Sequence, residues 1–183
     1  MVYDYNQAGE QRSFEVIPDK TIAVVQLNIR PGDAGPDGIF RRSKTGEAEM
    51  LDCELIVVGG PHDKRKFFDN MVVSGTTDGH ATAGDITHRK LRAIIESARG
   101  IKPADVSEAA KKARVAEYAD FDGIRFLAKI GVEPAKGDYK AKNILALVVT
   151  PDMKEWQPVE QVIKSAAPEK PASNVIVKPA WAS

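Results

Sequence analysis

The stretch AEMLDCELIVVGGPHDKRKFFDNMVV, residues 48–73, decides the fold that this sequence predicts. Its first half alternates, because Asp52 and Glu54 separate apolar side chains at positions 51, 53, 55 and 57. That period of two is typical of a half-buried strand. Gly59-Gly60-Pro61 ends the strand, since the glycines permit positive φ and the proline removes a ladder donor. The basic and aromatic run Lys64–Phe68 then leads into a second apolar segment, so the stretch predicts two adjacent strands joined by a turn.

The composition sets limits on the class of protein. The 183-residue chain has 26 basic and 26 acidic side chains, so its net charge alone indicates no polyanionic partner. The single cysteine, Cys53, excludes an internal disulfide, and its apolar-face position predicts a core residue. No apolar run approaches the roughly 20 residues that span a bilayer, and the polar N-terminal stretch is unlike a signal peptide. We therefore expect a soluble, cytoplasmic protein with no membrane partner.

Three further strands are predicted from alternating or apolar segments. They cover Thr21–Arg30, Phe121–Val132 and Asn143–Thr150. We expect residues 1–150 to form one domain that buries a real core. Residues 151–183 are rich in Pro, Ala and Lys, which predicts a largely disordered tail carrying Trp156 and Trp181.

Two helices are predicted between the third and fourth strands. An apolar stripe at i, i+3, i+4 and i+7 predicts the first over Asp85–Arg99, with Asp85 or Thr87 as its cap and Gly100 at its end. The second is predicted over Ala104–Tyr118, and its thin apolar face suits the surface. The segment Ser74–Gly84, which precedes them, reads as a flexible connection.

The order of three strands, a helix and two strands is that of the OB-fold, a five-stranded, partly open barrel. In that fold, the face of strands 2 and 3 and the loops 1–2 and 4–5 bind oligonucleotides or oligosaccharides. The corresponding loops here are Pro31–Glu47 and Glu133–Lys142, and each has several basic residues and one aromatic. The sequence thus predicts a mainly β, OB-type fold with an extra helix and a flexible tail. Another small α+β sheet with solvated lysines is the alternative.

Three segments of the chain also resemble a known family. They are SKTGEAEMLDCELIVVGGPHDKRKFFDNMVV, THRKLRAIIESARGI and DFDGIRFLAKIGVEPAKGDYKAKNILALVV, within residues 14–151. Together they are similar to phage and prophage proteins of the single-stranded DNA-binding kind, which are encoded near recombination and replication genes. The resemblance implies an OB-type fold and binding of single-stranded DNA.

Binding single strands without sequence preference requires basic side chains beside the phosphates and flat aromatic side chains that stack on bases. Both kinds gather in the two loops and at the start of strand three, and strand four adds outward basic residues. The candidate binding residues are Phe40, Arg41, Arg42, Lys44, Lys64, Arg65, Lys66, Phe67, Arg125, Lys129, Lys136, Tyr139, Lys140 and Lys142. Alternation places only one of Phe67 and Phe68 in the core. Asp52 and Glu54 count against the site, since they would repel phosphates from strand two.

No motif in the sequence indicates catalysis. The three histidines and Cys53 lack zinc-ligand spacing, and neither a phosphate loop nor a nucleophile elbow occurs. Asp120 and Asp122 would suit nuclease ligands, although turn-forming acids at a strand entry explain them better. The sequence therefore predicts no enzyme, no metal and no cofactor.

The predicted function is sequence-independent binding of single-stranded DNA in phage replication or recombination. Expected partners are that DNA, replication or recombination proteins that contact the tail, and further copies of the chain. One alternative is a non-catalytic protein-interaction module of the same fold. Another is a carbohydrate-binding barrel, which would need exposed tryptophans near the two loops, and these loops have none.

Overall fold

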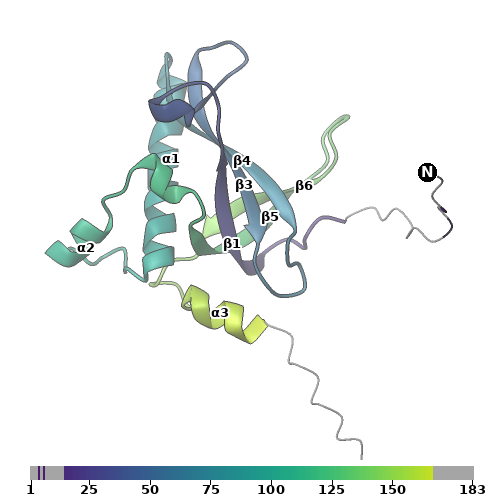
Figure 1. The fold of residues 1–183 in the computed structure, drawn as a ribbon, viewed down its shortest axis with the longest axis vertical. Coiled ribbons are helices and arrows are strands. Elements are labelled where there is room, and N and C mark those ends of the chain that lie inside the picture. Colours follow the sequence, from purple (N-terminus) through teal and green to yellow (C-terminus); the bar gives the residue numbers. More distant parts are fainter. Residues whose placement is uncertain (1–3, 5, 7–14, 167–183) are drawn as a thin grey trace, which may run out of the picture.

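The structure is a computed structural model that describes Asp4, Asn6 and residues 15–166, and its fold is mainly β (Figure 1). The strands are β1 (Thr21–Arg30), β2 (Arg41–Arg42), β3 (Ala48–Val57), β4 (Lys66–Gly75), β5 (Arg125–Glu133) and β6 (Lys142–Val148). The helices are α1 (Asp78–Arg99), α2 (Glu108–Ala113) and α3 (Val159–Ala166), with short 3-10 turns η2 (Pro36–Gly38) and η3 (Tyr118–Phe121). The predicted β-rich class and the order of three long strands, a helix and two strands are confirmed. The short β2 is an addition within the first predicted loop.

The strands form one antiparallel sheet that stays open. Its order is β2-β3-β1-β5-β6, and β4 also pairs with β3. Within residues 15–166, β4 pairs only with β3 and β6 pairs only with β5. Antiparallel pairings lead from β4 through β3, β1 and β5 to β6, so β4 and β6 run in the same direction and each keeps one free edge.

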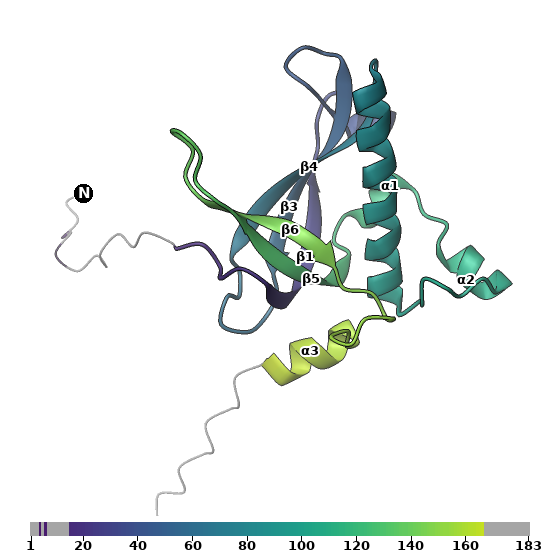
Figure 2. The ribbon, with the colours of Figure 1, turned by 180° about the vertical axis from the view of Figure 1, so that it is seen from behind.

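The main core lies between the sheet and α1, which stands along one side of the sheet in both views (Figures 1 and 2). The predicted apolar positions of β3 are all buried: Leu51, Cys53, Leu55 and Val57. Facing them, α1 supplies Leu91, Ile94 and Ile95 from its predicted stripe. Burying each large aliphatic side chain stabilises the fold by about 1.5–3 kcal/mol.

Helix α1 begins earlier than the sequence predicts. Its first residue is Asp78, and its cap is Thr77, whose hydroxyl oxygen accepts a hydrogen bond from the His80 amide at 3.2 Å. Neither Asp85 nor Thr87 is the cap, because both lie inside the helix. The predicted start was therefore wrong by about two turns.

Glycine explains why that first part of α1 was missed. The segment Ser74–Gly84 was expected to be flexible, yet Gly84 is buried within the helix. A Cβ at this position would lie 3.0 Å from the carbonyl oxygen of Val73 in β4, so the glycine permits close contact between helix and strand. At the other end, Gly100 closes α1 with φ 67°, as predicted.

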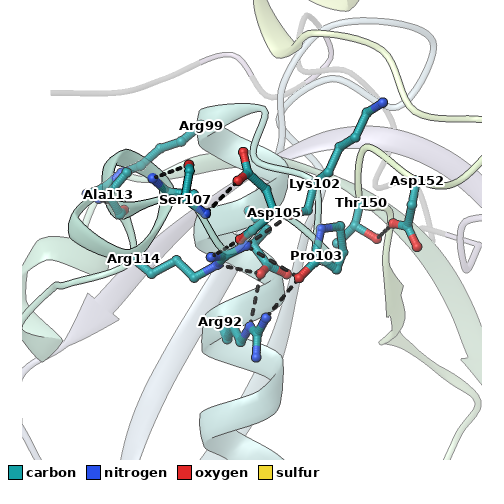
Figure 3. Close-up of polar contacts among 12 residues, drawn as sticks. Arg92, Arg99, Lys102, Pro103, Asp105, Ser107, Ala113, Arg114, Thr150 and Asp152 are labelled. Atoms are coloured by element: carbon teal, nitrogen blue, oxygen red, sulfur yellow. Dashed lines mark hydrogen bonds and ion pairs between the residues drawn. The ribbon is translucent and has the colours of Figure 1, made fainter.

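The second predicted helix is much shorter than expected, since α2 covers only Glu108–Ala113. Beyond it, the side chain of Arg114 donates hydrogen bonds to the carbonyl oxygens of Asp105 at 2.7 Å and Lys102 at 2.9 Å (Figure 3). Arg92, from α1, donates to the carbonyl of Pro103 at 3.1 Å (Figure 3). These bonds hold residues 102–114 around the guanidinium groups of Arg114 and Arg92 as a loop with a single short helix.

The prediction of a largely disordered tail is wrong for residues 151–166. They form turns and α3, which lies across one end of the sheet (Figure 2). An apolar cluster joins them to the sheet: Val24, Leu127, Val149 and Val159, bordered by Val58, Met153, Trp156, Val162 and Ile163. The Trp156 indole also donates a hydrogen bond to the Ser97 carbonyl at 3.3 Å. Trp181 and the rest of the predicted tail lie outside the described residues.

The helices of the described chain are short or amphipathic. The longest, α1, has 22 residues and carries charged side chains along its exposed side. Within the described residues, none of the helices has both the length and the apolar composition needed to cross a membrane.

Candidate functional site

The sheet has a second surface opposite the core, here called the outer face. It carries Gln26, Asn28 and Arg30 from β1, Asp52 and Glu54 from β3, and Lys66, Phe68 and Asn70 from β4. The ladder register places Arg30 opposite Asp52, and Asp52 opposite Asn70. It also places Glu54 opposite Phe68. The outer face is therefore a polar and charged surface centred on β3 and β4.

Asp52 lies at the centre of the outer face and is only 5% exposed. Its carboxylate accepts hydrogen bonds from both Nε and Nη2 of Arg30. Its second oxygen accepts from Nη1 of Arg41, which arrives from β2, at 2.9 Å. The sequence predicted that Asp52 would repel phosphates, but its charge is already paired with two guanidiniums. Those arginine side chains remain 48% and 55% exposed, so the cations, rather than the carboxylate, face the solvent.

Phe68 is the aromatic side chain of the outer face, and it is 50% exposed. The guanidinium of Arg30 reaches across β3 and lies 4.6 Å from the centroid of its ring. On the same strand, Lys66 makes an ion pair with Glu54 at 3.1 Å. The flat ring thus has one cation over it, Arg30, and a second cation, Lys66, on the same strand, and each cation is held by a carboxylate of β3.

A groove of ≈ 1060 Å³ separates the free edges of β4 and β6 and adjoins the outer face at Phe68. Its cationic lining residues are Lys64, Arg65, Lys66, Lys90 and Lys142. Several of them are paired, Lys90 with Asp69 at 2.7 Å and Lys142 with Glu133 at 3.0 Å. The groove is therefore of mixed charge.

Two of the predicted aromatic residues are not at this surface. Phe40 is 6% exposed and packs edge-on against Tyr118, with ring centroids 5.0 Å apart. Phe67 is 4% exposed and belongs to the main core, because alternation in β4 turns Phe68 outward instead. Neither Phe40 nor Phe67 can stack on a base, and the prediction that they do is wrong.

The predicted basic residues divide into several groups. The outer face and the groove together bring in Arg41, Lys64, Arg65, Lys66, Arg125 and Lys142. Arg125 joins the outer face through a hydrogen bond to Gln26 at 2.9 Å, whereas Lys129 lies farther along it, between Ile22 and Leu147. Outside both surfaces are the basic residues Arg42, Lys44, Lys136 and Lys140 and the third predicted aromatic, Tyr139. They are exposed on β2, on the turn after it and on the β5–β6 hairpin.

The list of candidates from the sequence omitted three residues that the structure brings to this surface. The sequence predicts Arg30 as the last residue of a strand, Phe68 as the alternative to Phe67, and Lys90 as part of a helix. Because successive side chains of a strand alternate in direction, the inward apolar residue Ile29, which is partly buried, could have indicated that Arg30 points outward. Nothing in the sequence shows that Lys90 of α1 reaches Asp69 of β4, because that contact depends on how the helix docks.

Cys53, His88 and Tyr118 suit structural roles. Cys53 is buried, and burial raises the pKa of its thiol to about 12, which leaves no thiolate at neutral pH. His88 is hydrogen-bonded to the hydroxyl of Tyr118 at 2.8 Å, and burial raises the pKa of that phenol. Within the described residues, no group of three or more His, Cys, Asp or Glu side chains is arranged to hold a metal ion.

Comparison with known proteins adds no family to these observations. A scan against models of protein families and a search of curated proteins both find no significant match to this chain.

Proposed function

We propose that this chain binds single-stranded DNA on its outer face, within a fold of OB type. The observation that carries the proposal is Phe68, which is half exposed, with the Arg30 guanidinium 4.6 Å from its ring centroid and Lys66 two residues before it on β4. OB-folds bind oligonucleotides on the face of their strands 2 and 3, and the second and third long strands here are β3 and β4. The exposed ring and its cations thus lie on the face that such a fold uses.

The mechanism combines electrostatic attraction with stacking. A base stacks on Phe68 and contributes about 1–3 kcal/mol, which any base can do because each has a flat π face. Arg30, Arg41, Lys66 and Arg125 neutralise neighbouring phosphates and release counterions. Asn70, two residues after Phe68 on β4, and Asn28, opposite Glu54 on β1, supply amide groups on the outer face without imposing one sequence. The zero net charge of the chain does not argue against DNA binding, since the four cations named above lie together on the outer face.

The resemblance of residues 14–151 to phage single-stranded DNA-binding proteins supports a role in replication or recombination. Within that proposal, residues 167–183 are the segment that contacts partner proteins, and copies of the chain associate along the DNA. The chemistry needs no metal and no cofactor, because binding involves no bond making or breaking.

A Phe68→Ala variant tests the proposal directly. We expect its affinity for a fluorescent oligo-dT to fall about tenfold, because one stacking contact of about 1–3 kcal/mol is lost. Fluorescence anisotropy at two salt concentrations measures the affinity, with a duplex of equal length as the comparison. Wild-type binding should weaken steeply with salt and should favour the single strand over the duplex.

The matched control is Ile86→Ala, which removes an apolar side chain of similar exposure, 55%, from α1. It should leave the affinity unchanged. Absence of wild-type binding at low salt would refute the assignment to single-stranded DNA, and equal affinities of Phe68→Ala and wild type would exclude Phe68 as the stacking residue.

One observation favours a second candidate, a protein-interaction module. The groove between β4 and β6 is bordered by two free strand edges, and an extended peptide can add to such an edge through main-chain hydrogen bonds. Peptide addition depends little on salt, whereas binding of nucleic acid depends on it strongly. The salt titration described above therefore separates the two functions.

A further inference from the structure

A carboxylate at the centre of a surface that binds a polyanion requires an explanation. By charge alone, removing Asp52 would raise the net charge of the outer face by one and strengthen attraction to phosphate. The contacts indicate the opposite. Asp52 is 5% exposed, both of its oxygens accept hydrogen bonds from guanidinium groups, and little of its charge faces a ligand.

The two arginines would be poorly ordered without this carboxylate. Arg30 comes from the end of β1 and Arg41 from the two-residue β2, and both side chains are about half exposed. Long, exposed side chains lose much rotamer freedom when a ligand immobilises them. Because Asp52 already holds both arginine side chains, their rotamer freedom is lost when the chain folds and not when the ligand binds. Asp52 also fixes the Arg30 guanidinium over Phe68 at 4.6 Å, which presents ring and cation together.

We infer that Asp52 is a positioning residue for nucleic-acid binding. It orients Arg30 and Arg41 toward phosphates and fixes Arg30 over the ring of Phe68. The inference rests on the proposed function, and it specifies how that site is organised. Its consequence runs against simple electrostatics: removing this negative charge weakens the binding of a polyanion.

The first test compares Asp52→Asn with wild type, using the oligo-dT assay over a series of salt concentrations. We expect affinity about tenfold weaker, and a slope of log Kobs against log salt that is smaller by about one, as for the loss of a phosphate contact. The control is Glu47→Gln, which also removes one negative charge, but from an exposed side chain for which the described residues show no ion pair. It should bind as well as wild type or slightly better.

The second test repeats the substitution in an Arg30→Gln/Arg41→Gln background. If Asp52 acts through the two arginines, Asp52→Asn no longer weakens binding there and instead tightens it, since only repulsion remains to be removed. A merely structural role gives the same loss in both backgrounds and leaves the salt slope unchanged. That outcome, or tighter binding of the single variant Asp52→Asn, overturns the inference.

Failure of the inference and failure of the proposed function are distinguishable. If wild type binds no single strand, the function is refuted, and the positioning role with it. If wild type binds, the NMR resonance of the Arg30 Nε–H reports whether Asp52 holds Arg30, because this group donates a hydrogen bond to Asp52 at 3.1 Å. The resonance should move in Asp52→Asn. Should Asp52→Asn not fold, Arg30→Lys replaces it. This variant keeps the charge but cannot make the forked contact, so weaker binding at an unchanged salt slope supports the inference and wild-type binding contradicts it.

Discussion

A Phe40→Ala variant is expected to lose about 3–5 kcal/mol of its free energy of unfolding, the usual cost of removing a buried phenylalanine side chain. The ring is 6% exposed and fills a space to which Gly35 and Tyr118 contribute. A Cβ on Gly35 would lie 2.1 Å from the ring, which shows how closely the backbone packs on it. The Phe40 carbonyl also accepts from the amides of Asp33 and Ala34. Truncation therefore leaves a cavity and loosens the loop that leads into β2.

Urea unfolding followed by circular dichroism measures this effect. Phe68→Ala is the control, and its stability should differ little from wild type because its ring is half exposed. Any loss of DNA binding by Phe40→Ala is expected to follow from the displaced Arg41, which comes next in the chain. A Phe40→Ala variant as stable as wild type but defective in binding would contradict the structure and would return Phe40 to the role of a stacking residue.

The second large effect is expected for Glu96→Ala, at about 3 kcal/mol of destabilisation. Glu96 is 3% exposed and accepts hydrogen bonds from Arg92 at 2.9 Å and from Arg114 at 2.7 Å. The side chain of Arg114 is only 15% exposed, so the substitution leaves a largely buried cation without its counter-charge. Arg92 is 56% exposed and can turn toward water, which places the cost at the low end of the range for broken buried pairs.

Thermal and urea unfolding measure the Glu96→Ala effect, with Glu108→Ala as the matched control. Glu108 also pairs with a cation, Lys111 at 2.7 Å, but both side chains are mostly exposed, so its loss should change little. Equal stability of the two variants would show that Glu96 is not the anchor of the loop around Arg114. Hydrogen exchange within residues 102–114 should rise in Glu96→Ala before the sheet is affected.

Local patterns were sufficient to predict the five long strands, but not β2, the start of β5 at Arg125 instead of Phe121, or every helix boundary. Thr21–Arg30 was predicted with both of its ends correct, because an alternating segment there is followed directly by Pro31 and Gly32. The start of α1 was missed because glycines read as flexibility, whereas Gly84 is needed for close packing on Val73. The distinction depends on a contact between two elements, which no local pattern contains.

The candidate site was predictable in kind but not in detail. The alternating direction of side chains along a strand indicates which of them face outward. It correctly predicted that only one of Phe67 and Phe68 lies in the core. It does not give the register between strands, and register places Arg30 beside Asp52 and Phe68. For that reason an acidic residue that the sequence predicted would repel phosphates is paired with two cations in the structure.

The burial of the single cysteine has a practical consequence. Cys53 lies in β3 with no exposed surface, and burial raises the pKa of its thiol to about 12. Reagents that modify thiols attack the thiolate, so they react only with molecules in which the sheet has opened. The rate of labelling by such a reagent therefore reports sheet opening without an added probe. Because the folded wild-type surface presents no competing thiol, a cysteine introduced beside the outer face would be the one site that takes a dye.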